Sequence, residues 1–481
     1  MGLDLEPDAK AGLGRPDRGH LGAGIARDHR RALVLETVPP GVYRNARRES
    51  RRFTPCAAQS EALHVPSQTI DVIVLGAGIV GVSAALAIQA RGRAVAIVDR
   101  MSQAASETSF GNSGIVQSEG ILPYVFPRKP REIMRAALNR DPRAHIRYGA
   151  LPSIAPALWR YFQASTEAGK TETARAMAAL VGAAGAEHRK LAAAANAGAL
   201  LRETGWVKVW RSARGEALAR KEIEELKPWG VSPVPLDRSA LLALEPHVGE
   251  AAIGGAHYPD PLTTPDPQGL AQSYTALFLE RGGRMEKGDA TSLEPAASGW
   301  MVTTERGRLA ARDVVIALGP WSNDLVRALG LRLPFFVKRG YHMHYEAKGN
   351  AGLGRPVLDL EKGYLIAPMK LGLRLTTGAE FARPEDASSP AHLARLEPFA
   401  REMFPIGPRK DAAPWLGRRP CLPDMRPIIG PFPGKPGLWL DFAHHHLGLT
   451  LGPISGRLLA EMMTGAPPIV DPAPFRAERF G

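Results

Sequence analysis

The stretch from Asp71 to Asp99, DVIVLGAGIVGVSAALAIQARGRAVAIVD, decides the fold. It opens on an uncharged, β-branched run at 72–75, which is typical of a strand buried on both faces of a parallel sheet. A glycine-rich turn at 76–81 follows, then a helix from residue 82 to 89 or 91, and a second buried strand that ends in Asp99. Strand, turn, helix and strand in this order predict a βαβ unit that binds a dinucleotide.

The three glycines of the turn have separate steric roles in such a unit. Gly76 allows the tight turn, Gly78 leaves room for a pyrophosphate, and Gly81 lets the helix pack closely on the strand. The helix N-terminus directs its amides and its positive dipole end at the phosphates. Asp99 stands where a carboxylate accepts a hydrogen bond from a ribose 2′-OH, which argues against NADP. The expected dinucleotide-binding residues here are Gly76, Ala77, Gly78, Ile79, Val80, Gly81 and Asp99.

Composition excludes several classes of protein. The 481 residues suffice for two or three domains. The only two cysteines, Cys56 and Cys421, rule out a disulfide framework and a CxxC metal knuckle. The net charge is +13, but the basic residues are spread out and no basic-aromatic platform stands out, so we expect no nucleic-acid partner. No run of 18 apolar residues exists, so we expect no membrane-spanning helix.

Residues 1–66 differ from the rest of the chain. They are rich in Gly, Arg, Asp and Pro, show little periodicity and lack the apolar core of a secretory signal. We expect a disordered N-terminal extension, with a targeting peptide as the alternative.

The remaining chain changes character several times. Residues 131–245 predict mainly helices, with one strand at 206–210. Strands and helices alternate again from residue 254, and Asp266-Pro267 is typical of a helix N-cap and first position. Residues 333–380 are rich in strand-forming residues and favour an antiparallel sheet.

Three segments outside the βαβ unit are candidates to lie beside a cofactor. Residues 106–114 are small and hydroxyl-bearing, and a buried strand at 313–318 ends in a turn at Gly319. A helix starting near 447–450 presents its positive N-terminus. The adjacent His444, His445 and His446 suggest a metal, but neighbouring residues point in different directions and no acid or cysteine completes a tetrahedron. We therefore expect no metal.

Four blocks occur in an order typical of one family: DVIVLGAGIVG at 71–81, ETSFGNSG at 107–114, VVIALGPWS at 314–322, and RRPCLPDMRPIIGP with HHHLGLTLGPISGRLLAE at 418–461. On these blocks the chain resembles the FAD-dependent D-amino-acid dehydrogenase and oxidase family over about residues 70–475, and the bacterial dehydrogenase branch in particular. Glycine and sarcosine oxidases share the fold of that family.

The resemblance implies a mixed α/β and α+β fold. A Rossmann-type FAD-binding domain would be assembled from residues 67–122, 243–332 and 416–476, and an antiparallel-sheet substrate domain from 123–242 and 333–415. The flavin, expected to be noncovalent FAD, would also lie beside Arg100, Ser109, Phe110, Gly111, Asn112, Gly319, Leu447, Gly448, Leu449 and Thr450.

The resemblance also implies a site for an amino acid. Arg419 would bind the substrate carboxylate, although the adjacent Arg418 leaves the register open and an ion pair with Asp424 is the structural alternative. A tyrosine hydroxyl would assist, with Tyr341, Tyr345 and Tyr364 as candidates. His444 and His446 would tune the flavin or line the site, or simply pack at the helix start. One departure is Ala443, where relatives usually have glycine before the histidine.

The implied reaction is oxidation of a D-amino acid, or a related amine with an α-carboxylate, to a 2-oxo acid. The neutral amine would assist hydride transfer from Cα to flavin N5. Rival hypotheses are a glycine- or sarcosine-type oxidase, a D-hydroxyproline-type dehydrogenase, and a non-catalytic flavin-binding or electron-transfer subunit that would not need Arg419. We expect a cytoplasmic protein that passes electrons to a respiratory quinone or another acceptor, with peripheral contact at the inner face of the bacterial membrane. The sequence leaves the acceptor and the oligomeric state open.

Overall fold

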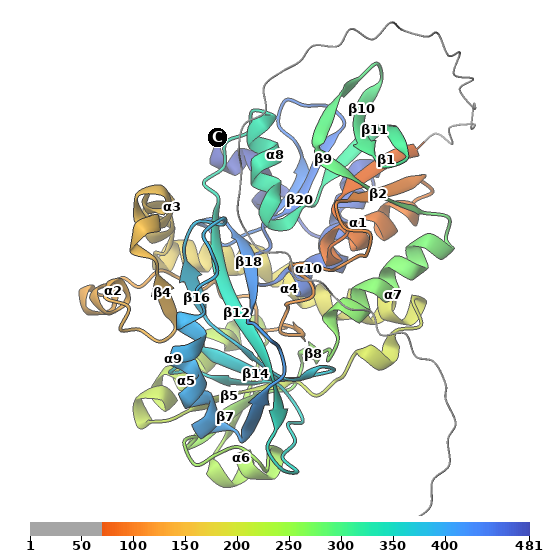
Figure 1. Cartoon of the computed structure of the whole chain (residues 1–481). Helices are drawn as coiled ribbons and strands as arrows, with labels where there is room; N and C mark the ends of the chain where they lie inside the picture. The colour runs from red at the N-terminus through yellow and green to blue at the C-terminus, as the bar shows by residue number, and fades with distance from the viewer. Residues whose placement is uncertain (1–69) are drawn as a thin grey trace, which may run out of the picture. The chain divides into compact units, whose positions relative to one another are not determined.

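A computed structural model describes residues 70–481 (Figure 1). The extension predicted at 1–66 lies outside the described residues. Within them the fold is mixed α/β, as expected, with one sheet built on the βαβ unit and a larger, mostly antiparallel sheet. No helix of the described residues is both long and apolar enough to cross a bilayer.

In the smaller sheet the first strand lies between two parallel neighbours. β1 (Ile70–Leu75) lies between β2 (Val95–Asp99) and β11 (Gly307–Ile316), and β11 pairs in parallel with β20 (Leu438–Phe442). Because residues 72–75, 95–98 and 314–316 of these strands are buried, their uncharged and mostly β-branched side chains fit a sheet covered on both faces. The other members of this sheet are β9 (Arg284–Ala296), β10 (Gly299–Thr304) and β19 (Ile428–Pro431).

Three helices contact this sheet and share one apolar core: α1 (Ile79–Gln89), α7 (Pro267–Glu280) and α10 (Gly448–Thr464). α4 (Glu167–Ala194) belongs to the same core and packs on α10 and α7. α10 crosses α1 at close range, because a Cβ on Gly456 would lie 2.7 Å from the backbone nitrogen of Ala84. The predicted start of α7 is confirmed, since Asp266 accepts from the backbone N–H of Gly269 at 2.8 Å. A short helix, α8 (Ser322–Ala328), follows β11.

The longest strand of the larger sheet is β12 (Phe336–Ala347). β12 pairs with β15 (Gly372–Thr376), β16 (Ala379–Phe381), β17 (Ile406–Arg409) and β18 (Trp415–Cys421). The sheet continues through β4 (Ala144–Ile146), β5 (Trp206–Trp210), β6 (Val234–Leu236), β7 (Gly254–Tyr258), β13 (Val357–Asp359) and β14 (Tyr364–Met369). A separate pair joins β3 (Ile115–Val116) to β8 (Leu262–Thr263).

Helices cover or flank this larger sheet. One face carries a second core that includes α9 (Ala391–Met403) and α6 (Arg238–Leu244). The remaining helices are α2 (Pro130–Ala137), α3 (Leu151–Ala164) and α5 (Ala213–Leu226). Figure 1 shows α2 and α3 beside the edge strand β4.

Two segments lie in the larger sheet although the expected boundaries grouped them with the FAD-binding segments. β7, within 243–332, pairs with β5 and β6, and β18, which begins the segment 416–476, pairs with β12 over its whole length. Sheet membership depends on which strands meet in space, which the order along the chain does not reveal. Both sheets belong to the same compact unit, so the division into two domains stays a prediction.

Candidate functional site

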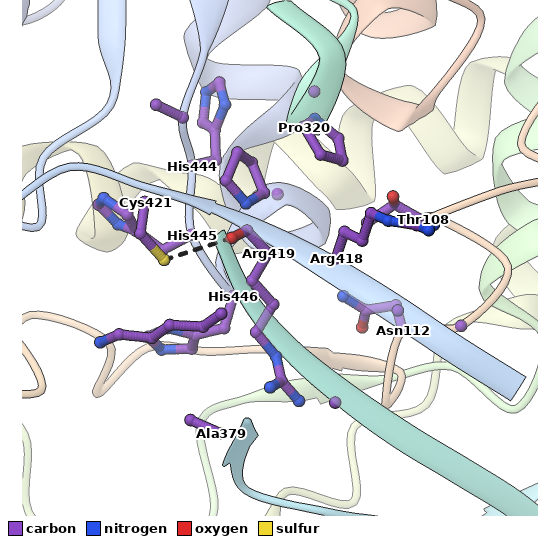
Figure 2. Close-up of a pocket in the computed structure, with 18 of the residues that line it drawn as sticks. Thr108, Asn112, Pro320, Ala379, Arg418, Arg419, Cys421, His444, His445 and His446 are labelled. Carbon is purple, nitrogen blue, oxygen red and sulfur yellow. Dashed lines mark hydrogen bonds between the residues drawn. The ribbon is translucent and has the colours of Figure 1, made fainter. Parts of the chain in front are cut away.

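A cavity of about 990 Å³ is lined by segments far apart in the sequence. One part of its wall comes from the glycine turn after β1, the loop 106–113 and the turn at Gly319. The other part comes from β12, β18 and the histidine segment before α10. Figure 2 shows Asn112, Arg419 and His446 converging on this space.

The glycine turn has the geometry that the sequence predicted. A Cβ on Gly76, where φ is +108°, would lie 2.6 Å from the carbonyl oxygen of Ala317, and a Cβ on Gly81 would lie 1.9 Å from the carbonyl oxygen of Gly76. At Gly78 the nearest atom to such a Cβ is Ser109 Oγ at 3.4 Å. The first and third glycines are therefore required by packing, while the second faces the cavity and leaves room for a ligand.

The start of α1 suits a phosphate. Gly78 is its N-cap residue and provides no side-chain cap, and Ser109 caps the first turn instead, because its Oγ accepts from the N–H of Ile79 at 3.0 Å. Asp99 is held by two amides, because Oδ2 accepts from Ala77 and Oδ1 from Met101, each at 2.7 Å. The carboxylate keeps free lone pairs toward the cavity that it lines. These residues fit the adenosine and diphosphate part of a dinucleotide.

The other expected cofactor residues divide into two groups. Arg100, Ser109, Gly111, Asn112, Gly319, Gly448 and Leu449 line the cavity, whereas Gly81, Phe110, Leu447 and Thr450 lie behind its wall. The ring of Phe110 packs against His342 and Trp415, with centroids 5.9 and 6.1 Å away. Thr450 Oγ1 accepts from the N–H of Gln117 at 3.1 Å and so connects α10 to the segment that follows the loop 106–113.

Arg374 holds the loop 106–113 by its main-chain carbonyls, and no local motif in the sequence points to this role. The guanidinium is 3% exposed and donates through Nη1 to the carbonyl oxygens of Phe110 at 3.0 Å and Asn112 at 2.5 Å. Its Nε lies 2.9 Å from Nε2 of His344, whose Nδ1 lies 2.8 Å from Asp411 Oδ2. Arginine can only donate, so His344 accepts at Nε2 and carries its proton at Nδ1, toward Asp411. Burial lowers the pKa of Arg374 to about 10, which leaves it charged at neutral pH.

Arg419 reaches the cavity from β18. It stands opposite Lys338 of β12, and opposite residues of an antiparallel pair share one face of the sheet, so both side chains line the cavity. Gly340 provides the space, because a Cβ there would lie 2.6 Å from Arg419 Nη1. The guanidinium donates to the carbonyl oxygens of Gly378 at 3.0 Å and Thr377 at 3.2 Å.

Within the described residues, no carboxylate lies within ion-pair distance of Arg419. Asp424, the expected structural alternative, pairs instead with Arg426 at 3.0 Å and Arg479 at 2.7 Å. Arg418 also touches the cavity wall, but its Nε donates to Pro384 O at 2.9 Å, and Figure 2 shows its side chain pointing toward Thr108 while Arg419 points toward Ala379. Arg419 is therefore a half-buried cation that no acid among residues 70–481 neutralises, although partial burial lowers its pKa.

The three expected tyrosines do not converge on Arg419. The hydroxyl of Tyr364 donates to Phe399 O at 2.8 Å, and Tyr345 belongs to the same core around α9, so neither lines the cavity. Tyr341 touches the cavity, but its hydroxyl lies 3.1 Å from Glu380 Oε2 and accepts from Arg339 at 2.9 Å. Alternation along β12 and β14 turns these hydroxyls to the face opposite Arg419.

Two cavity residues were missed by the sequence analysis. Tyr124 lines the cavity with its ring 4.8 Å from that of His446. The Nζ of Lys338 lies 3.0 Å from Tyr161 Oη and 4.2 Å from the centre of that ring. Neither residue sits in a recognisable motif, so the sequence held no signal for them beyond the position of Lys338 in a predicted strand.

The histidine segment combines buried rings with unusual backbone. His444 Nε2 lies 3.3 Å from Asp441 Oδ1, and both side chains are buried. Burial, Arg419 and Lys338 lower the pKa of His446 to about 3, so its ring is neutral at physiological pH. Ala443 and His445 have φ of +63° and +55°. Among residues 70–481, no three histidine, cysteine or acidic side chains cluster in a way that could hold a metal.

We expect Ala443→Gly to stabilise the protein by up to about 1 kcal/mol, because a left-handed conformation costs an L-residue about 1–2 kcal/mol and the extra freedom of glycine in the unfolded chain offsets part of the gain. Urea unfolding of the holoprotein measures the change. Ala87→Gly in α1, which has ordinary helical backbone, is the matched control and should destabilise the protein. A loss of stability in Ala443→Gly would contradict the strain at this position.

We expect Arg374→Lys to weaken binding of the FAD implied by the sequence about 10-fold or more, because an ammonium cannot hold two loop carbonyls and His344 together. Flavin fluorescence released on dilution measures the dissociation constant. Arg401→Lys in α9, which pairs with Glu397 away from the cavity, is the control. Equal FAD affinity in both variants would show that the loop does not depend on Arg374.

The model of the family described as FAD dependent oxidoreductase (DAO) matches residues 71–462. A D-amino acid dehydrogenase of Cereibacter sphaeroides is 30% identical, with 85% of this chain and 95% of that relative covered. A D-amino acid dehydrogenase of Rhizobium johnstonii is 29% identical, with 86% and 100% covered. Among solved structures, glycine oxidase from Geobacillus kaustophilus superposes with a TM-score of 0.65 at 20% identity, covering 85% and 98% of the two chains, which supports the fold. The match across most of the chain establishes that this protein belongs to the DAO family of FAD-dependent oxidoreductases.

Proposed function

We propose that this FAD-dependent oxidoreductase converts D-amino acids to 2-oxo acids, with Arg419 binding the substrate carboxylate. The observation that carries the proposal is an unpaired guanidinium in the cavity, within a fold whose relatives include D-amino acid dehydrogenases. A partly buried cation without a counter-ion is costly, and a carboxylate that accepts two parallel hydrogen bonds removes that cost.

The residues around Arg419 suit an amine that reacts in its neutral form. The neutral ring of His446 adds no positive charge that would compete with a proton on the amine. Tyr124, packed on that ring, and Lys338, held against Tyr161, narrow the space beside Arg419 and limit the orientations of a small substrate. When bound, FAD supplies the acceptor for the hydride that leaves Cα. Water then hydrolyses the imino acid to a 2-oxo acid and ammonia.

We propose that the FAD is held without a covalent bond. Gly78, Asp99 and Ser109 fit its diphosphate and ribose, and the loop held by Arg374 fits the flavin side. Cys421 is the one described cysteine, and burial raises the pKa of its thiol, which disfavours the thiolate needed for covalent attachment.

We expect Arg419→Lys to lower kcat/KM for D-amino acids about 10- to 100-fold, because lysine cannot bind a carboxylate through two parallel hydrogen bonds. Bleaching of the flavin absorption under nitrogen, with D-alanine, D-methionine, glycine and sarcosine, measures the reaction. Arg418→Lys is the matched control on the same strand and should change little. If glycine or sarcosine alone bleaches the flavin, the substrate class is wrong; if Arg419→Lys keeps wild-type kinetics, the role of Arg419 is wrong.

We also propose a cytoplasmic location with peripheral contact at the inner face of a bacterial membrane, where a respiratory quinone would take the electrons. Residues 128–160, which include α2 and the first ten residues of α3, contain eight basic and two acidic residues. None of the residues of α2 is buried, and Met134, Leu138, Tyr148 and Trp159 are 49–61% exposed. Tyr124 and Val125 extend this apolar and basic surface to the cavity that they line. Exposed apolar residues among basic ones favour an anionic lipid surface.

We expect the purified holoprotein to sediment with vesicles containing anionic lipid at low salt, and the double variant Arg131→Glu, Arg135→Glu to bind at least about 10-fold more weakly, since each basic residue near such a surface contributes about 1 kcal/mol. Arg220→Glu with Lys221→Glu on α5 is the matched control. Failure of the wild type to sediment would remove the membrane from the proposal, and fast reoxidation of the reduced protein by air would favour oxygen over a quinone.

A further inference from the structure

The cavity wall that carries Arg419 also carries a second cation, Lys338, whose charge the proposed reaction does not use. Lys338 stands directly opposite Arg419 in the pair of β12 and β18, and both side chains line the cavity. Lys338 is 8% exposed. Like charges that face each other across an antiparallel pair destabilise it, so an anion beside these two cations would stabilise the wall.

The strands that meet here place their own acid on the other face of the sheet. Phe381 of β16, Lys338 of β12 and Arg419 of β18 form one row across the cavity face. In the adjacent row Glu380 stands opposite Arg339, and the two form a buried ion pair at 2.8 Å. Because neighbouring residues of a strand point to opposite faces, Glu380 points away from Lys338.

Other acids that line the cavity are also paired elsewhere. They are Asp141 with Arg143 at 2.7 Å, Asp359 with Arg211 at 2.6 Å and Asp441 with His444 at 3.3 Å. Among residues 70–481 no carboxylate lies within ion-pair distance of the Lys338 ammonium. The described part of the chain therefore leaves Lys338, like Arg419, without a counter-ion.

The surroundings of the Lys338 ammonium hold it in place without neutralising it. Its Nζ donates to Tyr161 Oη at 3.0 Å and lies 3.9 Å from Met425 Sδ. It also lies 4.2 Å from the ring centre of Tyr161, and 5.6 and 6.0 Å from those of Phe336 and Phe381. An ammonium has three donors and a thioether is a weak acceptor, so one N–H remains for a ligand in the cavity.

The two cations extend in different directions from their shared row. The Nη1 of Arg419 lies over Gly340, where a Cβ would be 2.6 Å away, whereas Lys338 reaches Tyr161 with Phe336 beside it. Gly340 and Phe336 flank Lys338 at two residues on either side along β12, and a strand rises about 3.3 Å per residue. The two charges therefore suit two separate carboxylates of one small molecule.

We propose that Lys338 binds a second carboxylate of the substrate, which is then a D-amino acid with an acidic side chain, such as D-aspartate or D-glutamate. The inference rests on the proposed function, because Arg419 would hold the α-carboxylate of the same molecule. A carboxylate at Lys338 accepts a charge-assisted hydrogen bond and offsets the repulsion between the two cations.

The test compares D-glutamate with D-glutamine, which has nearly the same shape without the charge, by flavin bleaching under nitrogen. We expect the wild type to favour D-glutamate in kcat/KM by about 10-fold or more, and Lys338→Met to reduce this ratio about 10- to 100-fold. Lys338→Arg keeps the charge and should retain more of the preference. Lys362→Met is the matched control, because Lys362 also lies 4.2 Å from a ring centre, that of Phe399, but outside the cavity wall.

Calorimetry with glutarate and butyrate tests the same site without turnover. Glutarate carries two carboxylates, and butyrate is the same chain with one of them removed. We expect the wild-type holoprotein to bind glutarate about 10-fold or more tightly than butyrate, and Lys338→Met to lose most of this difference. Equal affinities in the wild type would overturn the subsite, whether or not Lys338→Met folds.

The remaining outcomes are distinct. A wild type that prefers D-glutamine, or a ratio that Lys338→Met leaves unchanged, would overturn the subsite. An equal loss for D-alanine and D-glutamate in Lys338→Met would overturn it too, because Lys338 would then serve the α-carboxylate together with Arg419. If no D-amino acid bleaches the flavin of the FAD-bound protein while glutarate still binds through Lys338, the proposed function fails and the anion site remains.

Discussion

Close backbone contact without side chains is the constraint on which the cofactor side of this protein depends. At one point β1, α1 and β11 meet so tightly that a Cβ on Gly81 would lie 1.9 Å from the carbonyl of Gly76, and one on Gly76 would lie 2.6 Å from that of Ala317. The same close contact occurs where α10 crosses α1, because a Cβ on Gly456 would lie 2.7 Å from the backbone nitrogen of Ala84. Because the helices sit this close, the N-termini of α1 and α10 both come to the same cavity, and their dipoles favour the electron-rich parts of one dinucleotide.

The substrate side depends on a different constraint, the register between β12 and β18. Pairing of Lys338 with Arg419 puts both cations on the cavity face, and Gly340 leaves the space in which the guanidinium lies. A one-residue shift of β18 against β12 would bring Arg418 to this face instead and turn Arg419 to the opposite one. In the native register Arg339 is fully buried and forms an ion pair with Glu380 at 2.8 Å, so the neutralised arginine stays in the core and Arg419 faces the cavity.

The sequence predicted what depends on neighbours along the chain and missed what depends on distant ones. The βαβ unit, its glycines and the Asp266 cap follow local rules, and the structure confirms their geometry. Membership of β7 and β18 in the larger sheet, and the direction of the Tyr345 and Tyr364 hydroxyls, depend on pairing with strands far away in the sequence. Arg374 could not be found for the same reason, since it lies more than 250 residues from the loop carbonyls that it holds.

At Ala443 the structure explains a departure that the sequence motif only records. The motif shows only that alanine replaces the usual glycine, while the structure shows why glycine is usual, because φ there is +63°. The backbone still takes the left-handed turn that brings His444 to Asp441 and His446 to Tyr124. The surrounding contacts therefore over-determine this turn, and its strain is balanced by the partners of the two histidines, of which Asp441 is buried and Tyr124 lines the cavity.

The position of Arg419 bears on the stereochemistry of the proposed reaction. Arg419 lies on the wall formed by β12 and β18, while the glycine turn after β1 and the loop 106–113 form another part of the wall. An amino acid that is held by its carboxylate at Arg419 and oxidised at its Cα–H bond has two of its four Cα substituents fixed. The amine and the side chain then exchange places between the D and L forms. Selectivity for one enantiomer therefore depends on which of these two groups fits the space beside Tyr124, Lys338 and His446.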